Sequence, residues 1–326
     1  MTKNVLIALD VLPHHKELFE KAAAGRCKFS FKKTSLVTKE DLKDVNAVVG
    51  NVSANVIKEA NALEFMQLNS AGCDQYLVPG VLNKDVKLCT AVGSYGLTVS
   101  EHMLALTFDL IRHLALYRDK QHNHDWSDCG NVTSIEGATI AVFGLGDIGG
   151  SYASKVKALG AKCVIGVRRN VKDKPDYIDE IYSFDDLDKV LPKADIVAMV
   201  LPDSSLTRNL MNKEHLSMMK KGAYLVNSGR GSAVNQEDLL DAIKSGHLAG
   251  AALDVTTPEP LPKDSPLWDE PRVVITPHVA GNFFLQETFE RMIRISASNL
   301  KAFLDGDNLR NLVKRCLLYT SDAADE

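Results

Sequence analysis

Apolar residues in the first hundred positions form short runs that are separated by segments with helical spacing. A helical segment at residues 15–25 lies between the first two runs and ends on Gly25, a common residue at a helix C-terminus. Strands that alternate with helices predict a mostly parallel sheet with helices on both faces. The runs are rich in β-branched and aromatic residues, as strands are: NVLIALD, CKFSF, NAVVGN, FMQLN and KLCTAV.

A long helical pattern follows at residues 98–121, and Thr98 or Ser100 is expected to cap its N-terminus. The segment has more apolar surface than one packed face needs. We therefore expect it to lie between domains or in a subunit interface. Its apolar residues recur at helical spacing: Met103, Leu106, Leu110 and Leu114.

A second alternating series predicts a second parallel sheet, and a long amphipathic helix at residues 283–306 ends the pattern. The fold class is therefore α/β, with two doubly wound parallel sheets. The apolar runs of the second series lie at residues 138–144, 162–167, 195–202, 223–229, 248–255 and 272–278.

Composition narrows the class of protein. The chain has 326 residues, 45% hydrophobic and 25% charged, which is enough for about two domains. A net charge of -4 gives no support to a nucleic-acid or anionic-membrane partner. The apolar runs are far shorter than the roughly 20 residues of a membrane span, and the N-terminus is typical of a first strand rather than a signal peptide. The six scattered cysteines include no CxxC pair and fit a reducing, cytoplasmic location.

The C-terminal residues 316–326, CLLYTSDAADE, have no pattern that links them to the preceding helix. They resemble the in-frame translation of a transposon adapter used in DNA library preparation. We therefore leave them out of the expected fold. A disordered native tail is the alternative interpretation.

A glycine-rich turn follows the apolar run at residues 138–144 and opens a helix. In that position a GxGxxG pattern is specific for a dinucleotide-binding turn. The first glycine permits the tight turn, the second lets the backbone approach a pyrophosphate, and the third lets the helix pack close to the strand. A purely structural turn is the alternative. The candidate cofactor contacts are Gly144, Gly146, Asp147, Ile148 and Gly149.

The next apolar run ends in two arginines where an acid is expected. In NAD-binding folds an acid about 20 residues after the turn binds the ribose hydroxyls. From Gly149, 149 + 19 = 168, and Arg168 and Arg169 stand there, with no carboxylate before Asp173. A guanidinium can pair with a 2′-phosphate but cannot accept a hydrogen bond from a hydroxyl. The sequence therefore favours NADP(H), with NAD(H) as the alternative if the arginines are only a solvated strand end.

Charged residues and a histidine follow three further strand ends, the edge where open α/β sheets bind ligands. Arg230 could hold an oxo-carboxylate through charge-assisted hydrogen bonds. His278 could deliver a proton to a carbonyl oxygen, and Glu259 could hydrogen-bond the imidazole and fix its tautomer. Taken singly, each has an ordinary structural explanation. The histidines of HNHD, residues 122–125, lack a further ligand, so no metal site is expected.

The motifs together resemble the D-isomer-specific 2-hydroxyacid dehydrogenase family, over about residues 69–281. The resemblance implies an enzyme that reduces a small 2-oxo acid to the D-2-hydroxy acid by hydride transfer, in a homodimer formed with the helix after Thr98. Arg168 departs from the acid of many members and is similar to the NADP-using glyoxylate/hydroxypyruvate reductases. The motifs are NSAGCD, TAVGSYGLTVSEHMLALTF, GLGDIG, NSGRGSAVN, ALDVTTPEPLP and PHVAG.

The same resemblance implies two Rossmann/flavodoxin-like lobes, with the cofactor lobe inserted into the substrate lobe. The substrate domain is expected at residues 1–98 and 284–315, and the dinucleotide-binding domain at residues 99–283.

Residue roles carry over one at a time from the matching motifs. Arg230 matches the substrate-orienting arginine, Glu259 the carboxylate that tunes the histidine, and His278 the acid/base. The remaining matches are binding residues. Leu201, Pro202, Thr207 and Asp254 are expected at the cofactor, and Ala71, Gly72 and Tyr95 at the substrate.

Two other functions stay open at this level. One is a non-catalytic, NAD(P)-sensing regulatory protein like the corepressors that share this fold. The other is an NAD-dependent phosphoglycerate or phosphite dehydrogenase. The complete Arg–Glu–His set favours turnover, and the arginines at the strand end favour NADPH.

Overall fold

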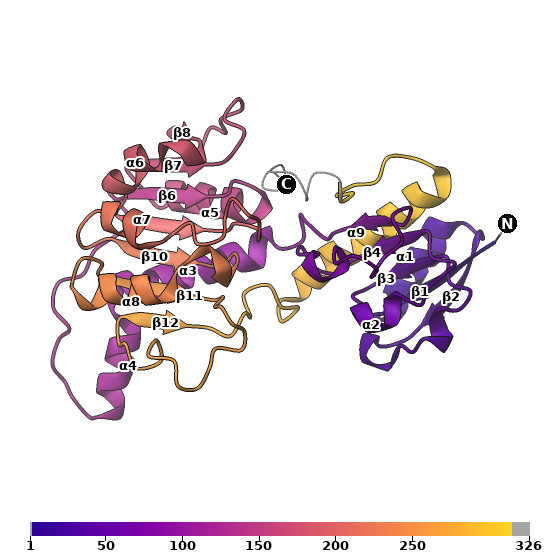
Figure 1. Ribbon diagram of the computed structural model, residues 1–326, viewed down its shortest axis with the longest axis horizontal. Helices are drawn as coiled ribbons and strands as arrows, with labels where there is room; N and C mark the ends of the chain where they lie inside the picture. The colour runs from indigo at the N-terminus through magenta and orange to yellow at the C-terminus, as the bar shows by residue number, and fades with distance from the viewer. Residues whose placement is uncertain (1, 315–326) are drawn as a thin grey trace. The chain divides into compact units, whose positions relative to one another are not determined.

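The structure is a computed structural model and describes residues 2–314. The suspected adapter-derived tail at residues 316–326 lies outside the described residues. The described chain divides into two compact units, one of residues 2–95 and 283–314 and the other of residues 96–282. The last helix, yellow in Figure 1, belongs to the same unit as the indigo N-terminal strands, so the second unit is an insertion into the first along the chain.

The first unit contains a five-stranded parallel sheet in the order β2-β1-β3-β4-β5, a flavodoxin-like order. All five strands were expected from the sequence. Strands β3 and β4 are buried along their whole length, as strands covered on both faces are. The bounds are β1 (Lys3–Ile7), β2 (Cys27–Phe31), β3 (Ala47–Val49), β4 (Phe65–Gln67) and β5 (Lys87–Cys89).

The helices of the first unit are α1 (Pro13–Ala23), α2 (Ala54–Ile57) and α9 (Gln286–Asp305). Helices α1 and α9 pack together, and the ring of Phe303 on α9 stacks on Phe65 of β4 with 4.9 Å between centroids. Helix α1 begins at Pro13, two residues before the expected start, and the chain leaves it through the left-handed Ala24 and Gly25.

The second unit contains a seven-stranded parallel sheet in the order β12-β11-β10-β9-β6-β7-β8. The chain runs outward from β6 to β8 and then returns to build the other half from β9. The order therefore reverses between β6 and β9, where Rossmann folds bind dinucleotides. The bounds are β6 (Thr139–Phe143), β7 (Cys163–Val167), β8 (Glu180–Tyr182), β9 (Ile196–Met199), β10 (Tyr224–Asn227), β11 (Gly250–Leu253) and β12 (Val273–Ile275).

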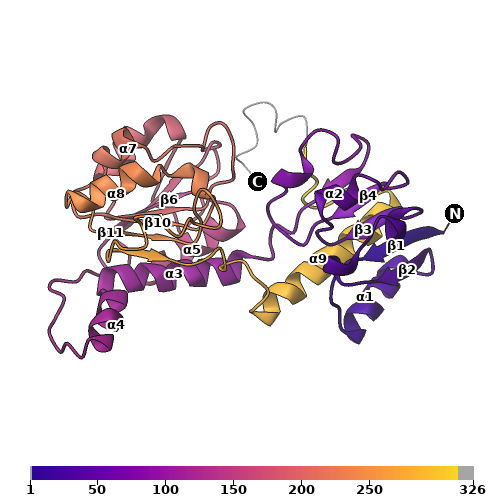
Figure 2. The ribbon, with the colours of Figure 1, turned by 60° about the horizontal axis from the view of Figure 1, so that its bottom comes forward.

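Helices cover both faces of the second sheet. Figure 2 shows α3 and α5 below the strands and α7 and α8 above them. Apolar side chains between the strands and the upper helices, including Phe143, Leu216 and Leu239, are fully buried. The bounds are α3 (Gly96–Arg112), α4 (Leu114–His122), α5 (Asp147–Ala158), α6 (Leu187–Val190), α7 (Lys213–Met218) and α8 (Gln236–Lys244).

The single helix expected at residues 98–121 is two helices in the structure. His113 adopts a left-handed conformation with φ of 59°, and the Asp109 carboxylate accepts a hydrogen bond from the N–H of Ala115 at 2.6 Å. A side chain that takes a backbone donor in this way competes with helical bonding. The expectation of one continuous helix was therefore wrong.

Two further expectations differ from the structure. Neither Thr98 nor Ser100 caps α3, because the helix begins at Gly96 and the Asp147 carboxylate accepts the Gly96 N–H at 2.7 Å. Strand β8 was not expected from the sequence. Within residues 2–314, no helix combines the length and apolar character needed to cross a membrane.

Candidate active site

The glycine-rich turn lies between β6 and α5, at the strand-order reversal. Gly144 has a φ of 89°, and a Cβ there would lie 2.7 Å from the carbonyl oxygen of Val200. A Cβ on Gly149 would collide with the carbonyl oxygen of Gly144, so α5 can approach the turn only with glycine at this position. The first N–H groups of α5 have no partner within the helix and face an anion favourably. The backbone N–H groups of this turn could therefore bind a pyrophosphate. Gly146, Asp147 and Ile148 are consecutive at the start of α5.

The Asp147 side chain connects two helices of the second unit. Its carboxylate accepts the N–H of Gly96, the first residue of α3. A Cβ on Gly96 would collide with that carboxylate, so glycine is needed at the start of α3 as well. Only the backbone of Asp147 is therefore a candidate for phosphate contact. Its side chain joins α3 to α5.

Arg168 directly follows β7 and is half-buried. Its Nη2 donates to the carbonyl oxygen of Asp173 at 2.5 Å, and its backbone N–H donates to Tyr182 at 3.1 Å. The buried Nε has no hydrogen-bond partner among the described residues. A buried N–H of a cation without an acceptor costs free energy, and an anionic ligand would remove that cost. Arg169 follows it and is also half-buried.

Hydrogen bonds of the Ser204 and Thr207 hydroxyl groups stabilise the loop after β9. Thr207 is buried and its Oγ1 donates to the carbonyl oxygen of Pro202 at 2.6 Å. Leu201 is also buried, so its side chain belongs to the core rather than to an open surface. Arg208 hydrogen-bonds Asp203 and holds the pKa of that carboxyl below its usual range. The loop is thus a rigid support at the carboxyl end of the sheet.

Arg230 stands after β10 between two glycines. Asn227 fixes the turn, since its side chain donates to the Arg230 carbonyl at 3.0 Å and accepts the N–H of Gly229 at 3.1 Å. A Cβ on Gly231 would collide with the backbone of Thr256. The guanidinium Nη1 donates to the carbonyl oxygen of Gly229 at 2.9 Å. The turn therefore presents a half-buried guanidinium at the carboxyl end of the strands.

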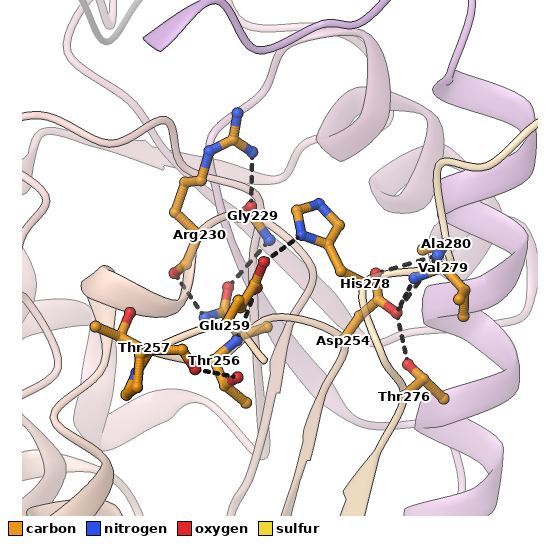
Figure 3. Close-up of polar contacts among 12 residues, drawn as sticks. Gly229, Arg230, Asp254, Thr256, Thr257, Glu259, Thr276, His278, Val279 and Ala280 are labelled. Atoms are coloured by element: carbon orange, nitrogen blue, oxygen red, sulfur yellow. Dashed lines mark hydrogen bonds and ion pairs between the residues drawn. The ribbon is translucent and has the colours of Figure 1, made fainter. Parts of the chain in front are cut away.

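Glu259 and His278 meet although 19 residues separate them in the chain. The Nδ1 of His278 lies 2.8 Å from Oε2 of Glu259, and Oε1 of Glu259 accepts the N–H of Thr256 at 3.1 Å. Figure 3 shows the Arg230 and His278 side chains on the same side of these loops, with Glu259 reaching up to the imidazole. The His278 side chain is 50% exposed, and within residues 2–314 no group hydrogen-bonds its Nε2. The carboxylate therefore sets a tautomer that leaves Nε2 facing outward.

Asp254 follows β11 and is 2% exposed. Its carboxylate accepts hydrogen bonds from the Thr276 hydroxyl at 2.6 Å, from the Val279 N–H at 3.0 Å and from the Ala280 N–H at 3.1 Å. Its carbonyl oxygen accepts the His278 N–H at 2.7 Å. Figure 3 shows these bonds converging on Asp254 from the chain around His278. This acid, which is expected at the cofactor, therefore also holds the loop of His278.

The three residues expected at the substrate lie in the first unit. Ala71 and Gly72 are half-buried in the turn after β4, and within the described residues no group accepts their backbone N–H. The Ser70 hydroxyl donates to the Gly72 carbonyl at 2.6 Å and shapes the turn. Tyr95 is buried, its hydroxyl donates to the Asn69 carbonyl, and burial raises the pKa of its phenol. Tyr95 therefore supports this turn from behind.

More than half of the chain matches a known protein family. Residues 104–280 match the model of the NAD binding domain of D-isomer specific 2-hydroxyacid dehydrogenases. The chain belongs to this family. A glyoxylate reductase from Thermofilum pendens is 32% identical over 272 residues, covering 82% of this chain and 79% of that protein.

Solved structures of the same family have the same fold as this dehydrogenase. A D-isomer specific 2-hydroxyacid dehydrogenase family protein from Aeromonas salmonicida superposes with a TM-score of 0.85 at 29% identity, covering 97% of this chain and 100% of that one. An NADPH-dependent glyoxylate/hydroxypyruvate reductase from Sinorhizobium meliloti, in complex with NADP and sulfate, gives a TM-score of 0.81 at 26% identity. It covers 97% of this chain and 99% of that one.

Two supporting residues of this dehydrogenase were missed by sequence reasoning. Gln236, the first residue of α8, holds the loop of Glu259 by donating to the Thr257 carbonyl and accepting its N–H at 3.2 Å. Thr276 hydrogen-bonds Asp254. Thr276 lies just before the PHVAG motif, in which the sequence analysis considered only the histidine. No local pattern in the sequence identifies Gln236, because it acts on a loop 21 residues further along the chain.

A histidine pair of the dehydrogenase meets a carboxylate in the first unit. Glu290 on α9 lies 2.9 Å from Nε2 of His15 and 3.3 Å from Nε2 of His14. The Nδ1 of His15 accepts the Leu12 N–H at 3.1 Å, so Nε2 carries the ring proton. A metal at Nε2 would require the proton on Nδ1, which that bond prevents. The cluster therefore serves to join α1 to α9.

Proposed function

We propose that this dehydrogenase reduces a small 2-oxo acid to the D-2-hydroxy acid with NADPH. The observation that carries the proposal is the pairing of His278 with Glu259, which leaves the outer imidazole nitrogen available beside Arg230. A histidine held by a carboxylate is suited to move a proton, and a guanidinium is suited to bind a carboxylate. Resemblance to the glyoxylate and hydroxypyruvate reductases supports a small acid as substrate.

Each residue has one task in the proposed reaction. When bound, the nicotinamide supplies the hydride that reaches C2 of the oxo acid. Arg230 binds and orients the oxo-carboxylate, and His278 gives the proton on Nε2 to the carbonyl oxygen, so that hydride and proton together yield the hydroxyl group. Glu259 stabilises the imidazolium that precedes proton transfer. In the reverse direction His278 accepts the hydroxyl proton.

Binding residues complete the proposal. In the second unit, the turn from Gly144 to Gly149 binds the pyrophosphate, Leu201, Pro202 and Thr207 support the cofactor, and Arg168 with Arg169 binds the 2′-phosphate. In the first unit, the unpartnered N–H groups of Ala71 and Gly72 bind a carboxylate.

The first experiment measures kcat/KM with NADPH and with NADH, for glyoxylate, hydroxypyruvate and a bulkier 2-oxo acid in turn. We expect NADPH to be preferred by at least about tenfold, because an arginine replaces the ribose-binding acid. The best acid then identifies the substrate class. A preference for NADH would contradict the cofactor assignment. Cofactor binding without oxidation by any acid would favour a sensor over an enzyme that uses these substrates.

We also propose that the dehydrogenase is a homodimer formed through α3 and the segment that follows it. Helix α4 buries none of its residues in its own chain, and Trp126 is fully exposed beyond it. Exposed apolar residues concentrated on one segment are typical of an interface. Sedimentation velocity is expected to give twice the mass of one chain, and Trp126→Ser to shift the protein toward monomer. A monomeric parent protein would contradict the proposal.

A further inference from the structure

The buried carboxylate of Asp254 needs compensation for its charge. Burial of an ionised carboxylate is costly unless hydrogen bonds or an opposite charge stabilise it. Two backbone N–H groups and the Thr276 hydroxyl supply part of this compensation. Among residues 2–314, the one basic side chain within 4.0 Å of the carboxylate is His102, whose Nε2 lies 3.6 Å from Oδ1.

His102 also contacts Thr276 directly, and the direction of the bonds can be assigned. The Nε2 of His102 lies 3.0 Å from Oγ1 of Thr276, which lies 2.6 Å from Oδ1 of Asp254. An ionised carboxylate only accepts, so the hydroxyl proton points to Asp254. The hydroxyl oxygen must then accept from His102, and Nε2 of His102 carries a proton. The result is a directed chain from His102 through Thr276 to Asp254.

The far end of this chain of bonds is the backbone around His278. His278 has a φ of 52°, a conformation that is unfavourable for a residue with a side chain. Its N–H is held by the carbonyl oxygen of Asp254, and the next two N–H groups are held by the Asp254 carboxylate. Thr98, also on α3, donates to the Ala280 carbonyl at 3.3 Å. Helix α3 thus contacts both ends of the 276–280 segment.

We propose that His102 is a positioning residue for the acid/base histidine. By donating to Thr276 and lying next to the Asp254 carboxylate, His102 keeps that carboxylate oriented. Asp254 then holds residues 276–280 in the bend that presents His278. The proposal rests on the proposed function of His278. It adds a role to His102, which lies 176 positions before His278 in the chain.

The test compares His102→Leu and Thr276→Val with His102→Gln, which keeps a donor that can reach the hydroxyl. The first two variants are expected to lower kcat about tenfold, because a small displacement of the reacting group is costly. His102→Gln is expected to restore most of the loss. The dissociation constant of NADPH is expected to stay within about twofold, because none of these side chains binds it. His247→Leu, in the turn between α8 and β11, is the matched control and is expected to leave kcat unchanged.

A double variant separates this proposal from a general loss of stability. If His102 acts through His278, then His102→Leu is expected to have no further effect on the residual rate of His278→Gln. Faster hydrogen exchange at the Val279 and Ala280 amides in His102→Leu is the structural sign expected. Additive losses, unchanged exchange, or no rescue by His102→Gln would overturn the proposal. Full activity of His278→Gln alone would instead overturn the proposed function.

Discussion

His278→Gln is expected to lower kcat for the preferred 2-oxo acid by about 10³-fold, within the range found for loss of a general acid. Glutamine keeps a polar side chain near Glu259 but has no nitrogen that can give up a proton to the carbonyl oxygen. The NADPH dissociation constant, measured by fluorescence titration, is expected to change by less than about twofold. The loss therefore falls on the chemical step rather than on cofactor binding.

A matched control and a second variant make this result specific. His247→Gln changes a histidine of the same unit, in the turn between α8 and β11, and is expected to keep full activity. Arg230→Ala is expected to remove most of kcat/KM for the oxo acid with NADPH binding retained, because it removes the carboxylate ligand and leaves the Glu259 pair intact. Full turnover in His278→Gln would rule out the proposed acid/base role.

The parts of the molecule that could be predicted from sequence are those whose structure is determined by residues close together in the chain. The Gly144 to Gly149 turn was recognised because strand, glycines and helix are consecutive, and the structure places it at the strand-order reversal. The position of Arg168 directly after β7 was predicted because the distance from that turn to the next strand end is fixed by the length of α5. Short-range geometry of this kind repeats in every dinucleotide-binding fold.

Contacts that join distant segments could not be predicted in the same way. His102 and Thr276 are 174 residues apart, and the sequence of α3 shows only an amphipathic helix at this point. The hydrogen bonds of Asp254 to Thr276, Val279 and Ala280 were not predicted either, because its partners lie more than 20 residues further along the chain. The break at His113 coincides with a hydrogen bond from the Ala115 N–H to the Asp109 carboxylate, a side-chain contact that the helical pattern does not reveal.

Arg168→Ser is expected to have the second large effect, on the choice of cofactor. The variant should lower kcat/KM for NADPH by about 100-fold, equivalent to ~2.7 kcal/mol, the size of one to two charge-assisted hydrogen bonds. The value for NADH should change by less than about threefold, because the arginine has no acceptor for the ribose hydroxyls. Arg294→Ser, on the exposed face of α9, removes the same charge elsewhere and should change neither value.

Binding of cofactor fragments tests the same residue without turnover. Calorimetry should show that 2′,5′-ADP binds the parent protein more tightly than 5′-ADP, and that Arg168→Ser removes this difference. The structure gives the reason, since the guanidinium is already anchored through Nη2 on Asp173 while its buried Nε has no acceptor among the described residues. A 2′-phosphate would thus bind a guanidinium that is already held in place, so binding would not have to immobilise a mobile side chain. Equal binding of the two fragments by the parent protein would show that the guanidinium does not bind the 2′-phosphate.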